Sequence, residues 1–137
     1  MVMDSSAQDH VRGTTDRYLS RLAAGDVTGV LALFSDDGVV SSPMTGRIPA
    51  REFYPELAAA TQRSAVTPLD VFVSVADTRR AAVRFRYDWR LPDGQPTSFD
   101  CVDVLTFTED WSIAELRIVY DTHPLRAAWR ASLRGTR

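Results

Sequence analysis

In the first half of the chain, apolar side chains recur three or four residues apart, which is the spacing of one face of a helix. The pattern predicts three helices, over residues 10–24, 27–34 and 51–60. Gly25 is a natural stop for the first helix, and Asp26 is a natural cap for the second. A short β-branched stretch, Val39–Ser42, lies between the second and third helices. The first residues are mostly small and polar, so we expect residues 1–9 to form a flexible N-terminus and residues 10–137 a single domain.

The second half is rich in β-branched and aromatic residues, which favour extended strands. It predicts four strands, over residues 67–76, 81–90, 97–108 and 112–121. Turn residues such as Pro92-Asp93-Gly94 connect the strands and suit antiparallel hairpins. A last helix is predicted over residues 124–133. Helices followed by a run of antiparallel strands are typical of an α+β protein.

Alternation along two of these strands predicts which side chains share a face of the sheet. In the strand over residues 81–90, the inward row is Val83, Phe85, Tyr87 and Trp89. In the strand over residues 97–108, the inward row is Phe99, Cys101, Asp103, Leu105 and Phe107. Asp103 is thus a single carboxyl group on an apolar stripe, where burial should raise its pKa. A carboxyl group that stays neutral can donate a hydrogen bond to a substrate.

Two other interpretations of these residues stay open. Asp103 would face outward if the strand register were one residue different, and it could instead cap a buried backbone group. Tyr18 and Tyr54, on the first and third helices, are each more often core tyrosines than active-site groups when taken alone. Only their combination with Asp103 makes them candidates for a functional site.

Composition and charge narrow the classes of function. Hydrophobic residues make up 45% of the 137 residues and charged residues 25%, as in an ordinary soluble globular protein. The net charge of -2 gives no reason to expect nucleic acid as a partner. All 16 basic residues are arginine, which excludes a Schiff-base lysine.

Cysteine and histidine are too few for a disulfide or a metal site. Cys101 is the only cysteine, and His10 and His123 have no partner at the spacing of metal ligands. No apolar run approaches the roughly 18 residues that cross a bilayer. We therefore expect a cytoplasmic protein that holds no metal and does not contact a membrane.

A series of short motifs extends along most of the chain. In order they are Arg17-Tyr18, Ala24-Gly25-Asp26, Leu33 to Asp37, Gly46, Arg51 to Tyr54, Val102 to Phe107 and Ile113 to Arg117. In order and approximate spacing the series resembles the ketosteroid isomerase and SnoaL-like polyketide cyclase family. The resemblance implies the cone-shaped α+β fold of the nuclear transport factor 2-like superfamily. In that fold a strongly curved mixed or antiparallel sheet and N-terminal helices enclose an apolar cavity.

Carried over by position, the resemblance assigns roles to particular residues. Tyr18 matches the oxyanion-hole tyrosine of the isomerases, Asp103 matches the protonated acid beside it, and Tyr54 matches a supporting tyrosine. The general-base aspartate of the isomerases is replaced here by Ser42, which Pro43 follows. Serine cannot shuttle a proton as a carboxylate does, so steroid isomerisation in its usual form is not expected.

A substitute base has three candidates on the last strand or just beyond it. Asp121 and His123 come first, and Glu115 is third because it lies nearer the turn. In relatives that resemble limonene-epoxide hydrolase, a second catalytic carboxylate lies within that strand, and the matching position here is Ile118. Simple epoxide hydrolysis by that arrangement is therefore disfavoured.

The leading hypothesis is a cofactor-independent cyclase or isomerase that acts on a hydrophobic polyketide- or terpenoid-like intermediate of secondary metabolism. Tyr18 and Asp103 would donate hydrogen bonds to the substrate, with Asp121 or His123 as further catalytic candidates. The predicted substrate-binding residues are Ser42, Tyr54, Phe85, Tyr87, Trp89, Cys101 and Phe107. The family resemblance also implies a homodimer. The rival hypothesis is a non-catalytic small-molecule-binding or dimerisation module of the same fold.

Overall fold

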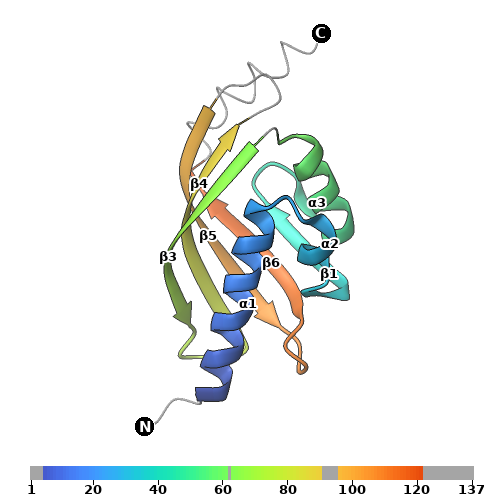
Figure 1. Cartoon of the computed structure of the whole chain (residues 1–137). Coiled ribbons are helices and arrows are strands. Elements are labelled where there is room, and N and C mark those ends of the chain that lie inside the picture. Colours follow the sequence, from blue (N-terminus) through green and yellow to red (C-terminus); the bar gives the residue numbers. More distant parts are fainter. Residues whose placement is uncertain (1–4, 62, 91–95, 122–137) are drawn as a thin grey trace.

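Three helices and one six-stranded sheet make up the computed structural model, which describes residues 5–61, 63–90 and 96–121 (Figure 1). In chain order they are α1 (Ser5–Ala23), α2 (Val27–Leu31), β1 (Phe34–Ser42), β2 (Gly46–Pro49), α3 (Ala50–Ala59), β3 (Arg63–Val73), β4 (Arg80–Arg90), β5 (Pro96–Phe107) and β6 (Ile113–Tyr120). The predicted helix over residues 124–133 lies outside the described residues, as does His123. Within the described residues, no helix is long and apolar enough to cross a membrane.

The strands lie side by side in the order β2-β1-β6-β5-β4-β3. β1 and β6 are parallel, whereas the other neighbouring pairs are antiparallel. In the long β4–β5 ladder, Phe85 pairs with Cys101 and Val83 pairs with Asp103. Paired residues point to the same face of a sheet, so the two predicted inward rows form one surface. The predicted α+β class and mixed, mainly antiparallel sheet are confirmed.

The helices cover one face of the curved sheet (Figure 1). α1 packs against β3 and α2, and α3 packs against β1 and α2. The core between these layers contains Val83, Leu105 and Leu116, none of which is exposed. Burying an aliphatic side chain of this size contributes about 1.5–3 kcal/mol. On β4 every second residue from Ala81 to Trp89 is buried, which confirms the inward row of that strand.

The first helix begins earlier than predicted. α1 starts at Ser5 rather than His10, so most of the segment expected to be flexible is helical. Ala7 is only 3% exposed and Val11 is fully buried. These two residues are four apart and so lie on one helical face, which the small size of Ala7 made easy to miss.

Three further boundaries differ from the prediction. α2 ends at Leu31, and Phe34 belongs to β1, where it pairs with Ile113. The ladder between β1 and β6 is interrupted between Phe34 and Val39, which allows the polar segment Ser35 to Gly38 within the strand. β3 covers residues 63–73 rather than 67–76. The short strand β2 was not predicted, because four residues are too few for an alternation pattern to be recognised.

Candidate active site

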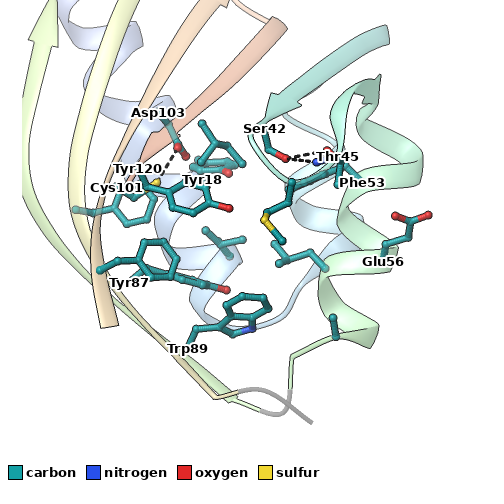
Figure 2. Close-up of a pocket in the computed structure, with 17 residues that line it drawn as sticks. Tyr18, Ser42, Thr45, Phe53, Glu56, Tyr87, Trp89, Cys101, Asp103 and Tyr120 are labelled. Atoms are coloured by element: carbon teal, nitrogen blue, oxygen red, sulfur yellow. Dashed lines mark hydrogen bonds between the residues drawn. The ribbon is translucent and has the colours of Figure 1, made fainter. Parts of the chain in front are cut away.

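A pocket of about 280 Å³ lies between the inner face of the sheet and helices α1 and α3 (Figure 2). Its described lining includes seven aromatic side chains: Tyr18, Phe53, Phe85, Tyr87, Trp89, Phe99 and Tyr120. The other described lining residues with polar side-chain groups are Ser42, Thr45, Glu56, Cys101 and Asp103. Within the described part of the chain, no arginine or histidine lines the pocket. The site is therefore an apolar cavity with a small set of hydrogen-bonding groups and no cation among its described lining residues.

Strand alternation explains how β4 and β5 supply the sheet side of the pocket. Phe85, Tyr87 and Trp89 are two residues apart on β4, and they are 2%, 6% and 7% exposed. Cys101 and Asp103 have the same spacing on β5, beside this aromatic row. All five side chains line the pocket.

Asp103 is almost completely buried, with 1% of its surface exposed. The Cys101 thiol donates a hydrogen bond to Oδ1 of Asp103 at 3.2 Å. Burial raises the pKa of Asp103 to about 7, and hydrogen bonding from Cys101 and Tyr18 acts in the opposite direction. Asp103 faces inward, so the register in which it would point to solvent is excluded. Its contacts are with side chains of the pocket, which speaks against a backbone cap.

Tyr18 is 1% exposed and lines the same pocket from α1. Its hydroxyl forms a hydrogen bond of 2.8 Å with the hydroxyl of Tyr54 on α3. Burial raises the pKa of the Tyr18 hydroxyl well above its ordinary value, so the phenol stays protonated at physiological pH. Tyr18 is thus a neutral donor held in place by a second phenol.

Two residues predicted to bind the substrate lie outside the pocket lining. Tyr54 is buried against Phe53, with ring centroids 5.0 Å apart, and reaches the site only through its bond to Tyr18. Phe107 lies at the far end of β5 and packs against Trp111 at 5.5 Å. Alternation assigns Phe107 to the correct face, but it says nothing of where along the strand the pocket ends.

Ser42 lines the pocket, yet its hydroxyl serves the turn that follows β1. It accepts a hydrogen bond from the Thr45 backbone N–H at 3.1 Å and shares another of 2.8 Å with the Thr45 hydroxyl. The dashed lines between these residues in Figure 2 mark the two contacts. This is the geometry of a serine-stabilised turn. A hydroxyl engaged in this way has no feature of a general base.

The two described candidates for a substitute base lie outside the pocket lining, and His123 is not among the described residues. Glu115 forms an ion pair with Arg47 at 3.0 Å and does not line the pocket. Asp121 is exposed and is also absent from the lining. Ile118 does line the pocket, and it pairs with Asp103 across the β5–β6 ladder. The position at which epoxide-hydrolysing relatives were expected to carry a second carboxylate is therefore an apolar wall.

The helical side of the pocket was not predicted from the sequence. Phe53, Leu57 and Ala60 line it from α3 and from the residue after that helix. Their spacing of four and three residues was visible in the sequence and indicates one face of a helix. The sequence did not show which surface this face packs against. Glu56 was also missed, and it is the second carboxylate among the described lining residues.

The chain matches a known family over most of its length. The model of the SnoaL-like domain matches residues 15–116. The chain belongs to the SnoaL-like domain family. The matched segment of this SnoaL-like protein contains Tyr18, Tyr54 and Asp103.

Solved structures with the same fold include proteins of different descriptions. PrhC from Penicillium brasilianum is 18% identical with a TM-score of 0.76, and the match covers 92% of this chain and 93% of PrhC. SalBIII, an epoxide hydrolase/cyclase-like enzyme of pyran ring formation in the polyether salinomycin, is 16% identical with a TM-score of 0.74, covering 85% and 95%. An NTF2-like protein of unknown function from Exiguobacterium is 20% identical with a TM-score of 0.70, covering 79% and 98%. At these identities the likeness establishes that the SnoaL-like chain has the NTF2-like fold.

Proposed function

We propose that this SnoaL-like protein is a cofactor-independent enzyme, an acid-assisted cyclase or isomerase that activates a carbonyl, hydroxyl or epoxide oxygen of a hydrophobic substrate. Tyr18 and Asp103 are the two groups that donate hydrogen bonds to this oxygen. The observation that carries the proposal is a buried carboxyl group of raised pKa that lines an aromatic pocket beside a buried phenol.

Tyr18 and the protonated form of Asp103, which makes up about half of the protein at pH 7, stabilise the negative charge that develops on an oxygen in the transition state. They act in a site whose described lining is largely apolar, where a hydrogen bond to a developing charge is stronger than in water. Their orientation is fixed before the substrate arrives, because Tyr18 is bonded to Tyr54 and Asp103 to Cys101. Removing one such donor typically costs 10²–10³-fold in rate.

The substrate class follows from the shape and chemistry of the lining. A cavity of about 280 Å³ with aromatic walls suits a ring-bearing polyketide- or terpenoid-like molecule with few polar groups. SalBIII, which shares the fold, takes part in pyran ring formation. By analogy of fold, that likeness favours ring formation over hydrolysis. The residue opposite Asp103 points the same way, because Ile118 has no carboxylate to activate a water.

Glu56 is the other carboxylate among the described lining residues, and it lies on α3, across the pocket from Asp103. Its carboxylate is exposed and points away from the cavity in Figure 2. A general base must lie within hydrogen-bond reach of the proton that it takes, so Glu56 is given no catalytic role. The assignments of Asp121 and His123 as catalytic groups stay predictions, as does the homodimer.

A binding measurement with 2-naphthol tests the donor pair, because this probe has two fused aromatic rings and one oxygen. We expect Tyr18→Phe and Asp103→Leu, which each remove a donor, to weaken binding roughly 5- to 10-fold, the effect of losing one hydrogen bond. Asp100→Leu is the matched control, since Asp100 is on the same strand, exposed and paired with Arg84 on the other face. Equal affinities for the Asp103 and Asp100 variants would contradict the proposal.

Turnover distinguishes an enzyme from the rival binding module. Ketones and epoxides of polyketide or terpenoid type are incubated with the protein and with the Asp103→Leu variant, and the products are followed by mass spectrometry. We expect conversion to fall 10²–10³-fold in Asp103→Leu, which removes one donor. Binding of 2-naphthol without conversion of any such substrate favours the binding module.

A further inference from the structure

Cys101 donates a hydrogen bond to the carboxyl group of Asp103, which lies two residues further along the same strand. Cys101 and Asp103 are 3% and 1% exposed, and both line the pocket. Their side chains point to the same face because they are two residues apart on β5. The Cys101 Sγ lies 3.2 Å from Oδ1 of Asp103, as the dashed line in Figure 2 marks. This distance is in the range of a hydrogen bond from sulfur, so the thiol donates to Oδ1.

The groups that surround this pair leave the thiol in its protonated form. The titratable side chains that face it are Tyr18 from α1, Tyr54 from α3, Tyr87 from β4 and Tyr120 from β6. All four are phenols whose pKa is raised by burial, so none of them brings a positive charge. Burial and the neighbouring Asp103 carboxylate raise the pKa of the Cys101 thiol as well. A thiol in such surroundings is a donor rather than a nucleophile.

A protonated carboxyl group has two unlike oxygens, one that only accepts hydrogen bonds and one that carries the proton. A donor aimed at Oδ1 makes Oδ1 the accepting oxygen. We propose that Cys101 is a positioning residue, which holds Oδ1 of Asp103 by its thiol and so places the acidic proton on Oδ2, from where it is donated to the ligand. This inference rests on the proposed role of Asp103 as a hydrogen-bond donor.

The same contact also affects the pKa of Asp103, because it stabilises the charged form of the carboxyl group. A thiol that donates to a carboxylate stabilises the negative charge and lowers the pKa of Asp103, against the effect of burial. Cys101 therefore has two measurable consequences, the direction of the proton and the pH at which it is lost. A cysteine that only filled space would have neither.

The test compares Cys101→Val, which removes the donor, with Cys101→Ser, which keeps one. The titration of Asp103 is followed by the ¹³C NMR signal of its carboxyl carbon, which Asp103→Asn identifies by its disappearance. Cys101→Val is expected to raise the pKa of Asp103 by about half to one unit, because a thiol is a weak donor. Cys101→Ser is expected to leave that pKa at or below the wild-type value. Where valine prevents folding, Cys101→Ala is measured in its place.

A control on the other face of β5 separates the hydrogen bond from a general disturbance of the strand. Val102→Ser lies between the two residues in sequence, outside the pocket lining, and is expected to leave the pKa of Asp103 unchanged. Binding of 2-naphthol at neutral pH is expected to weaken severalfold in Cys101→Val and to persist in Cys101→Ser. The inference is overturned if the valine and serine variants shift the pKa of Asp103 equally, or not at all. If Asp103→Leu, which removes the donor, does not weaken binding of 2-naphthol, the proposed function fails, and the titration still decides the role of Cys101.

Discussion

Asp103 is the residue at which function and stability conflict. Its carboxyl group has no cationic partner among the described lining residues, and burial raises its pKa to about 7. The folded protein thus retains a proton that the unfolded chain releases near pH 4.

At this scale the sequence predicted a good deal, because alternation on β5 placed one carboxyl group on an apolar stripe. It could not predict the contact from Cys101, which depends on the rotamers of both side chains.

The raised pKa of Asp103 predicts a dependence of stability on pH. Between pH 4 and pH 7 the folded state binds more protons than the unfolded state, so the free energy of unfolding falls as the pH rises. Ionising this buried group costs about 4 kcal/mol at pH values above 7. Asp103→Asn is expected to remove this part of the slope and to be more stable than the wild type at pH 8. Urea denaturation at a series of pH values measures both effects, and equal slopes for the two proteins would show that Asp103 is not buried as described.

At the scale of elements, the end of the molecule remote from the pocket holds α1 to the sheet. The guanidinium of Arg79 donates to the backbone oxygens of Thr108 and Glu109, each at 2.9 Å, and lies 3.9 Å from the ring centroid of Trp111. Trp111 also stacks on His10 of α1, with ring centroids 4.8 Å apart. The loop before β4, the turn between β5 and β6, and the first helix therefore meet around one indole ring.

Removing Arg79 should loosen all three of these elements. Arg79→Ala is expected to lower the free energy of unfolding by about 2 kcal/mol, from the lost cation–π contact and two charge-assisted hydrogen bonds. The neighbouring Arg80→Ala is the control, because Arg80 is exposed and should change stability by no more than about 0.5 kcal/mol. Thermal unfolding of the two variants measures the difference. Equal melting temperatures would contradict the role given to Arg79.

The elements themselves were predictable to different degrees. Helical spacing gave α3 within one residue at each end, and alternation gave β4 and β5 within one residue at each end. The start of β1 was not predictable, because Phe34 continues the helical spacing of α2 and becomes a strand residue only by pairing with Ile113, far along the chain. Non-local pairing of this kind overrides local preference.

At the scale of the whole molecule, the sheet and helices create an interior space that neither half of the chain could form alone. Tyr18 reaches it from the first helix and Asp103 from the fifth strand, 85 positions later in the sequence. The resemblance to SnoaL-like proteins suggested this convergence, whereas the periodicity of either segment could not. The helical wall with Phe53 and Glu56 became visible only when α3 was placed against the sheet.

A crystal structure of the protein with bound 2-naphthol tests the central claim most directly. The account predicts that the rings of the probe lie among the aromatic side chains of β4 and β5. Its oxygen should lie about 2.5–3.0 Å from both the Tyr18 hydroxyl and Oδ2 of Asp103. A probe whose oxygen points away from these two groups, toward the rim near Glu56, or a probe bound outside the pocket, would contradict it.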